Sequence, residues 1–372
     1  MDLQTHNHLR RGSFRLNRHP LDRVAREPHT CIFEITRRCN LRCIHCESHC
    51  GEVSHRELST ERIRCVAREL VQLGCHHVDV TGGEPLLHPE WDGLCRNFAE
   101  VGLRTALITN GTLLDEECLT RARDAGVAAV GISLDGLQAT HDRIRLRRGA
   151  GPSPWRETVA AIERALPRIE TIVMTAVNRL NLAELPALRD HLDGMGVQRW
   201  QIQLVVPMGR ALAVGQPFVI APGDLETLTA FLVEARANGK TPRIDVSDTI
   251  GYFTERELGM RGSVDARSLW NGCQAGIRAV AITYDGRVRG CSLMPPEFDA
   301  GDLHDESLTT IWNDAERFAY STRFDAAKLA GPCGRCRVGP LCRAGCTTMA
   351  YWTTGSIYTN PFCLHRVRGG CV

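Results

Sequence analysis

Short apolar runs rich in β-branched residues alternate with longer amphipathic stretches over the first half of the chain. The runs predict strands at about 31–36, 77–81, 104–109, 128–134, 170–177 and 198–206. The stretches between them predict helices, for example over residues 59–74, where a Ser/Thr cap precedes an acidic first turn. Repeated β–α units of this kind imply a parallel sheet with right-handed crossovers.

Six units are too few for a closed eight-stranded barrel. We therefore expect an α/β fold, either a partial (β/α)6 TIM-like barrel or a doubly wound sheet. In both folds, ligands gather at the C-terminal ends of the strands.

The pattern changes after Pro207. Residues 222–238 predict one more amphipathic helix, and 243–270 predict an irregular connection. Two short strands around Asp285-Gly286 predict a hairpin, and a cysteine-rich segment of short helices and loops follows at 301–372. Because that last segment has little apolar core of its own, we expect bound metal to hold it together.

Composition narrows the class of protein. A hydrophobic content of 43% and a net charge of +2 are ordinary for a globular protein, and they favour neither a nucleic-acid nor a membrane partner. No apolar run approaches the ~18 residues that span a bilayer, and the basic N-terminus lacks the apolar stretch of a secretory signal. We therefore expect a cytoplasmic protein, in which thiols stay free or ligate metals.

The 17 cysteines are unevenly placed, and their odd number excludes complete disulfide pairing. Cys39, Cys43 and Cys46 form a C-x3-C-x2-C pattern directly after the first predicted strand. Three thiolates on one loop suit three irons of a cubane cluster and leave the fourth iron open to a ligand. A zinc site is the alternative, although the pattern has no matching pair nearby.

Polar turns follow the next three predicted strands, and all of them should converge on the cysteine loop. Thr81-Gly82-Gly83-Glu84-Pro85 ends the second strand, Asn110-Gly111 the third, and Ser133-Leu134-Asp135-Gly136 the fourth. Bare glycine backbone admits close approach of a ligand. Each turn also has an ordinary explanation, because glycine-rich turns commonly end strands.

The cysteine pattern followed by TGGEP resembles the radical S-adenosylmethionine (SAM) superfamily over residues 31–206. The resemblance implies that Cys39, Cys43 and Cys46 ligate a [4Fe-4S] cluster whose open iron chelates SAM. It also implies cofactor contacts from the residues that match the family's SAM-binding positions, which are Gly82, Gly83, Glu84, Asn110, Ser133 and Arg143, with Arg145 as the alternative to Arg143. His45 departs from the aromatic residue that is commoner before the last cysteine.

A second cysteine group resembles the SPASM domain, which carries two auxiliary iron–sulfur clusters in one branch of this superfamily. All seven cysteines and Gly286 match its spacing, whereas a pair of zinc sites would need eight thiolates. The resemblance assigns Cys273, Cys291 and Cys346 to the first auxiliary cluster. It assigns Cys333, Cys336, Cys342 and Cys363 to the second. The first would then have an open iron, or a non-cysteine or distant ligand such as Cys371.

The remaining cysteines are expected to be structural, and they are Cys31, Cys50, Cys65, Cys75, Cys95, Cys118 and Cys371. The expected domains are an N-terminal extension (1–30), a radical SAM partial barrel (31–215), a connecting segment (216–270) and a small α+β iron–sulfur SPASM domain (271–372).

The resemblance implies a radical SAM oxidoreductase, a peptide or cofactor maturase that removes hydrogen from a substrate C–H bond by way of a 5′-deoxyadenosyl radical. The favoured substrate is a ribosomally synthesised peptide that is oxidised or crosslinked, recognised directly or with a separate protein, because residues 1–30 are too few for a recognition domain. The alternatives are a small-molecule or cofactor precursor of the modified heme or quinone type, and formylglycine maturation of sulfatases. A flavodoxin- or ferredoxin-type electron donor is expected, and no residue is assigned as the catalytic acid or base.

Overall fold

The structure of the chain is a computed structural model that describes residues 21, 25–51, 56–214, 218–239, 241–252, 254, 256–261 and 272–369. Most of the predicted N-terminal extension lies outside these residues. No helix among them is both long enough and apolar enough to cross a bilayer.

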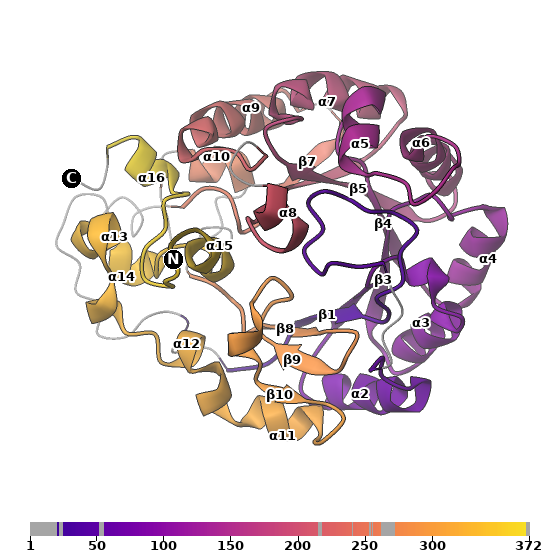
Figure 1. The fold of residues 1–372 in the computed structure, drawn as a ribbon, viewed down its shortest axis with the longest axis horizontal. Helices are drawn as coiled ribbons and strands as arrows, with labels where there is room; N and C mark the ends of the chain where they lie inside the picture. The colour runs from indigo at the N-terminus through magenta and orange to yellow at the C-terminus, as the bar shows by residue number, and fades with distance from the viewer. Residues whose placement is uncertain are drawn as a thin grey trace.

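One ten-stranded sheet runs through the described part of the chain, in the order β10-β9-β8-β1-β2-β3-β4-β5-β6-β7 (Figure 1). The six predicted strands are confirmed as β1 (Thr30–Glu34), β2 (His77–Thr81), β3 (Arg104–Thr109), β4 (Ala129–Ser133), β5 (Glu170–Val177) and β6 (Arg199–Leu204). Neighbouring pairs among these strands are all parallel. The sheet curves into a partial barrel, as Figure 1 shows, and this confirms the predicted fold class.

Strands that the β–α pattern did not reveal extend the sheet at both edges. β7 (Arg243–Val246) pairs in parallel with β6, so the prediction of an irregular connection was wrong at this point. Only four residues long, β7 is too short to show a clear period-two pattern. At the other edge, β8 (Ala279–Ile282) pairs in parallel with β1.

The predicted hairpin is confirmed by the antiparallel pair of β8 and β9 (Arg287–Arg289), and β10 (Gly301–Asp302) adds to β9. The C-terminal hairpin is therefore part of the barrel sheet, next to the strand that leads into the cysteine loop.

Helices cover the outer face of the sheet (Figure 1). They are α2 (Thr60–Gln72), α3 (Trp91–Glu100), α4 (Glu116–Asp124), α5 (Gln138–Ile144), α6 (Pro154–Ala165), α7 (Leu185–Gly194) and α9 (Leu225–Ala237), with the shorter α8 (Gly209–Val214) and α10 (Glu257–Arg261) near the open side. α2 begins as predicted, because the Ser59 hydroxyl accepts a hydrogen bond from the Arg62 amide at 3.2 Å.

The C-terminal region consists of short helices joined by loops, as the sequence predicted. These helices are α11 (Leu308–Asn313), α12 (Ala319–Thr322), α13 (Gly331–Arg335), α14 (Gly339–Cys342), α15 (Thr347–Thr354) and α16 (Leu364–Val367).

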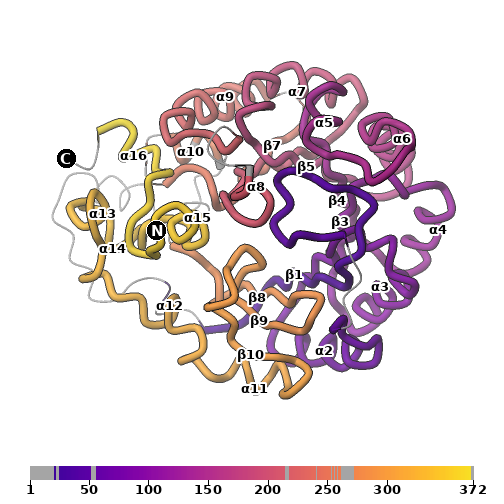
Figure 2. Tube along the Cα trace, viewed as in Figure 1, coloured from indigo at the N-terminus to yellow at the C-terminus, as the bar shows by residue number. Residues whose placement is uncertain are grey.

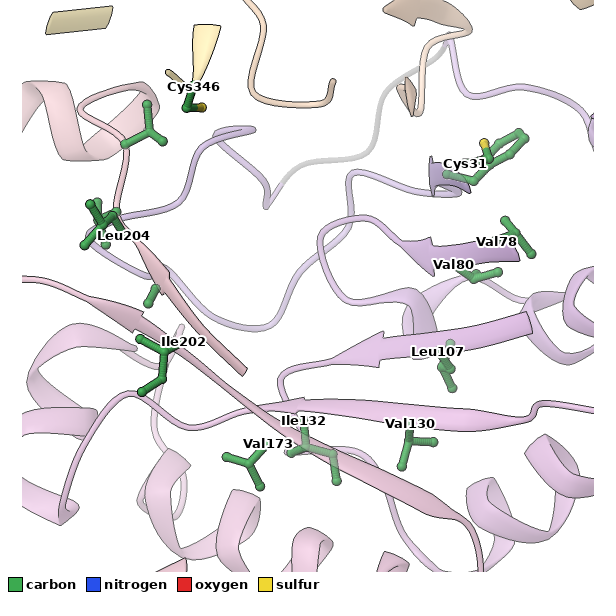
Figure 3. Packing of buried hydrophobic residues seen from close by; sticks show 14 of the residues in the cluster. Cys31, Val78, Val80, Leu107, Val130, Ile132, Val173, Ile202, Leu204 and Cys346 are labelled. Carbon is green, nitrogen blue, oxygen red and sulfur yellow. The ribbon is translucent and has the colours of Figure 1, made fainter. Parts of the chain in front are cut away.

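The two faces of the barrel sheet differ in the size and polarity of their side chains. Buried apolar residues such as Val78, Leu107 and Val130 form the core between strands and helices (Figure 3). The inner face carries small or polar residues such as Ala106, Gly131 and Gln201 among a few larger apolar ones. A closed barrel fills its interior with large branched side chains. The inner face of this sheet therefore leaves room for a ligand.

The side chain of Arg62 ties the C-terminal region to α2. Its Nε donates to the Leu303 carbonyl at 2.8 Å and its Nη2 to the Glu306 carbonyl at 2.7 Å. Arg64, two residues further along the same helix, is partly exposed, and its carboxylate contact, to Glu61, is 3.9 Å long.

We expect Arg62→Gln to lower the free energy of unfolding by about 1–3 kcal/mol, because it leaves two part-buried carbonyls without their donor. Arg64→Gln is the matched control and should change it by no more than about 0.5 kcal/mol. Urea unfolding of the metal-loaded protein measures both. Equal effects of the two substitutions would contradict a specific role for Arg62.

Candidate functional site

A cavity of about 520 Å³ occupies the inside of the partial barrel, and we call it the lumen. Its walls are the inward residues of β1 to β6, its mouth is the loop of residues 35–51 that follows β1, and one side is closed by Cys291, Ser292 and Leu293 from the C-terminal region. We call residues 35–51 the cysteine loop. It passes over the C-terminal ends of the strands, next to α8 (Figure 2).

The structure brings Cys39, Cys43 and Cys46 together at the mouth of the lumen, and all three line it. Burial raises the pKa of the Cys39 thiol to about 12 and that of Cys43 to about 11. Because iron–sulfur ligands must be thiolates, a bound cation would have to supply the missing stabilisation. Three desolvated thiols around one cavity are a donor set that fits a cluster.

Cys46 has the opposite shift, because Cys50 lies beside it. The Cys50 thiol donates a hydrogen bond to the Cys46 sulfur, and this, together with the nearby Arg210 guanidinium, outweighs burial and lowers the pKa of Cys46 to about 6. Cys50 also lines the lumen, so its position differs from the purely structural one that the sequence suggested.

The Gly82-Gly83 turn lies against the cysteine loop with no space for a side chain. A Cβ on Gly82 would lie 2.4 Å from the Thr36 carbonyl oxygen, and one on Gly83 would lie 2.1 Å from that of Arg38. The Gly83 amide donates to Thr36 at 2.8 Å and the Glu84 amide to Arg38 at 2.7 Å. Both glycines line the lumen, as expected, and they are also what lets the loop settle on the strand ends.

The four cysteines at 333, 336, 342 and 363 line one small pocket of about 20 Å³ in the C-terminal region. Burial raises the pKa of the Cys291 thiol, and the charges of Cys346 and Cys273 raise it further. Cys291 therefore lies close to both of these cysteines. The structure thus gathers the two predicted groups separately. Cys371 lies outside the described residues. Within them, no three His, Cys, Asp or Glu side chains stand close enough to share a single metal ion.

Of the other cysteines, Cys31, Cys75 and Cys95 are buried in the core between sheet and helices. Cys65 and Cys118 are partly exposed on α2 and α4.

Two protein-family models match the chain. The model of the radical SAM superfamily covers residues 33–192, and that of the SPASM iron-sulfur cluster-binding domain covers residues 273–337. The chain belongs to the radical SAM superfamily. It is an enzyme of the SPASM-containing branch, with SAM, a SAM-binding iron–sulfur cluster and auxiliary clusters as its cofactors, as the sequence predicted.

Relatives of this radical SAM enzyme act on different substrates. It is 29% identical over 362 residues to the AdoMet-dependent heme synthase of Methanosarcina barkeri, a match that covers 92% of the chain and 98% of the relative. It is 27% identical over 344 residues to the PqqA peptide cyclase of Bradyrhizobium diazoefficiens, covering 90% and 86%.

Among solved structures, SuiB of Streptococcus suis bound to S-adenosylmethionine superposes with a TM-score of 0.70 at 14% identity. The match covers 90% of this chain and 76% of SuiB. At that identity the likeness shows a shared fold.

Glu84 lies behind the glycine turn rather than in the lumen of this radical SAM enzyme. Its carboxylate is fully buried and accepts hydrogen bonds from the Thr109 hydroxyl (2.7 Å) and the Asn110 amide (2.8 Å). Burial still raises the pKa of Glu84 to about 7. Contrary to the expectation from sequence, this side chain joins β2 to β3, and its oxygens are occupied by the protein.

Asn110 and Ser133 line the lumen, as predicted, but Arg143 does not. Arg143 lies on the outer face of α5 and is exposed. Arg145, just past the end of that helix, turns inward, and its Nη1 lies 4.0 Å from the Cys43 sulfur. The position of Arg143 therefore does not support the predicted cofactor contact. Arg145, the alternative, is the residue that reaches the lumen, because the helix ends between the two.

Sequence reasoning assigned no role to the side chain of Asp135, which is fully buried at the end of β4. It pairs with Arg145 at 2.7 Å, accepts the Ala176 amide at 2.9 Å and lies 3.5 Å from His45 Nε2. Burial alone would raise its pKa, but Arg145 and the neighbouring histidines lower it overall. Asp135 thus fixes a buried cation beside the cysteine loop. Its place in SLDG, directly after a strand, was the available signal.

We expect Gly83→Ala to displace the cysteine loop, because the new Cβ would meet backbone rather than a mobile side chain. The free energy of unfolding of the metal-free protein should fall by about 1–3 kcal/mol, and the anaerobically reconstituted enzyme should lose roughly four irons, the content of one cubane cluster.

Gly93→Ala on α3 is the matched control, since a Cβ there meets open space. It should leave the iron content unchanged and raise stability by up to about 1 kcal/mol. A Gly83→Ala enzyme with full iron content and unchanged stability would show that the turn does not constrain the loop.

Proposed function

We propose that this radical SAM/SPASM enzyme oxidises an unactivated C–H bond in a carboxylate-bearing side chain of a heme-type cofactor precursor. The observation that carries the proposal is a match to a heme synthase over almost its whole length. Arg104, Arg145, Arg199 and Arg210 also line the lumen, and the first three already pair with carboxylates of the chain. Guanidinium groups are the preferred partners of carboxylates, which they bind in a bidentate manner.

We further propose the ligand sets that the spacing implied. Cys39, Cys43 and Cys46 would hold the cluster that binds SAM, and their common position at the mouth of the lumen supports this. Cys273, Cys291 and Cys346 would hold the first auxiliary cluster. The second would take Cys333, Cys336, Cys342 and Cys363, which share one pocket.

When bound, SAM and its cluster supply an organic radical that can remove hydrogen from an unactivated C–H bond. The chain's own residues provide the chamber for this chemistry. Ile108, Ile172 and Met174 give the lumen apolar walls that exclude water, and Gln201 and Gln203 present amides for orientation.

The C-terminal region contributes to the same chamber. Cys291 lines the lumen and is one of the three cysteines proposed for the first auxiliary cluster. Whatever that site binds therefore stands next to the substrate. This position supports a part for the auxiliary domain in handling the oxidised substrate. The proposed external electron donor is a flavodoxin- or ferredoxin-type protein.

A ribosomal peptide is the second candidate substrate. The observation that favours it is the similarity to the PqqA peptide cyclase, at an identity close to that of the heme synthase. Under both proposals a substrate side chain enters the lumen. The two differ in the molecule that carries it, a porphyrin or a peptide.

The test supplies the anaerobically reconstituted enzyme with SAM, a reductant and either iron-coproporphyrin or any short peptide that is found to be encoded beside its gene. We expect SAM cleavage to 5′-deoxyadenosine in both cases, and loss of propionate carboxyl groups as CO₂ with the porphyrin. A peptide that loses two hydrogens while the porphyrin is unchanged would reverse the choice of substrate. Absence of 5′-deoxyadenosine with intact clusters would contradict the proposed reaction as a whole.

Substitution of the proposed ligands should separate the cluster sites. Cys39→Ser should abolish 5′-deoxyadenosine formation, because it removes a ligand of the SAM-binding cluster. Cys333→Ser should preserve slow SAM cleavage but lose roughly four irons and substrate oxidation. Cys65→Ser, at a partly exposed position on α2, is the control and should keep both. Iron analysis and product chromatography measure these outcomes, and loss of SAM cleavage in Cys65→Ser would undermine the assignment.

A further inference from the structure

Arg210 connects α8 to the cysteine loop through three hydrogen bonds. Its backbone amide donates to the Cys46 carbonyl at 3.0 Å, its Nε to the Cys43 carbonyl at 2.8 Å and its Nη1 to the Cys50 carbonyl at 3.1 Å. The residue therefore holds the loop at two of the proposed cluster ligands and at Cys50, the neighbour of Cys46.

The preceding residue brings this contact about. Gly209 has a φ of +56°, and a Cβ there would lie 2.4 Å from the carbonyl oxygens of both Cys46 and Glu47. Glycine alone therefore lets the start of α8 lie directly on the loop, which places the Arg210 side chain at the wall of the lumen.

The charge of Arg210 has no carboxylate partner among the described residues, in contrast to Arg145, which pairs with Asp135 at 2.7 Å. Its Nη2 is buried and finds no hydrogen-bond acceptor in the part of the chain that the structure describes. A buried cation is costly unless an anion lies nearby. Negative charge at this place can come from Cys43 and Cys46, whose carbonyls Arg210 holds, and from Glu47, which lines the same lumen.

We propose that Arg210 is a positioning and charge-compensating residue for the SAM-binding cluster. Its hydrogen bonds fix the cysteine loop, and its charge makes the cluster easier to reduce. The inference rests on the proposed assignment of Cys39, Cys43 and Cys46 as ligands.

The expected direction follows from electrostatics. Reduction adds an electron to a site that already carries thiolates and lies in a region of low dielectric constant. A fixed positive charge stabilises the reduced state more than the oxidised one, and net charge is one of the factors that set the potential of an iron–sulfur cluster.

Arg148 offers a matched control, because it holds the same loop from outside. Its Nη2 donates to the Cys50 carbonyl at 3.1 Å and its Nε to the Leu41 carbonyl at 3.2 Å, but it is exposed and does not line the lumen. Loss of Arg148 thus removes loop contacts without removing a charge from the wall of the lumen.

The test is a redox titration of the full-length reconstituted enzyme followed by electron paramagnetic resonance, with the cluster identified by the change in its spectrum when SAM is added. For Arg210→Gln we expect the ratio of reduced to oxidised cluster at a given potential to fall about tenfold, which for a one-electron couple equals about 59 mV. Arg210→Lys, which keeps the charge, and Arg148→Gln should stay within about threefold of wild type.

Hydrogen exchange of the full-length reconstituted enzyme supplies a readout that does not depend on the redox titration. The amides of the cysteine loop should exchange faster in both Arg210 variants than in wild type. If Arg210→Gln fails to assemble the cluster, the test depends on Arg210→Lys, which keeps the charge. A tenfold fall in the ratio of reduced to oxidised cluster in that variant would overturn the role of the charge.

An unchanged midpoint in a fully loaded Arg210→Gln enzyme, or an equal shift in Arg148→Gln, would also overturn the role of the charge, and unchanged exchange would overturn the positioning role. A wild-type enzyme with no cluster that responds to SAM would instead contradict the ligand assignment, and the exchange measurement would still test the positioning role.

Discussion

The close contact between the Gly82-Gly83 turn and the cysteine loop is the constraint on which the site depends. Backbone meets backbone there, since the carbonyls of Thr36 and Arg38 lie where side chains of the turn would otherwise be. The turn is itself anchored to β3, because the Glu84 carboxylate accepts hydrogen bonds from Thr109 and Asn110. The thiols at the mouth of the lumen are thus fixed by the strands beneath them rather than by the loop's own conformation.

The two arginines at the mouth of the lumen differ in how their positive charge is balanced. Arg145 is neutralised by Asp135 within the protein, and their ion pair ties the end of β4 to the chain that follows α5. Arg210 donates only to carbonyls among the described residues, so its charge stays available to whatever anion the site holds. Two arginines at the same cavity can therefore serve different purposes, one structural and one electrostatic.

The sequence predicted the parallel sheet and the grouping of cysteines because both leave local signals, in β-branched runs and in fixed spacing. It did not distinguish Arg143 from Arg145, because the choice depends on where α5 ends, and helix ends are weakly encoded. It missed β7, which is only four residues long, and it placed Glu84 in the lumen because a motif gives residue order but not side-chain direction. Arg210 lies at least 160 residues from the cysteines that it contacts, and only the fold brings them together.

The parallel pairing of β8 with β1 has a consequence for how the two halves of this enzyme can be separated. The register runs from Thr30 opposite Ala279 to Phe33 opposite Ile282. The C-terminal region therefore covers the edge of β1, the strand that leads into the cysteine loop. A chain cut before residue 272 would expose that edge, and an uncovered edge strand is a template for pairing with another molecule. The radical-forming half is therefore not a self-sufficient module. Its solubility depends on the auxiliary half, so shuffling of the two between relatives would have to preserve this strand pairing as well as the cysteines.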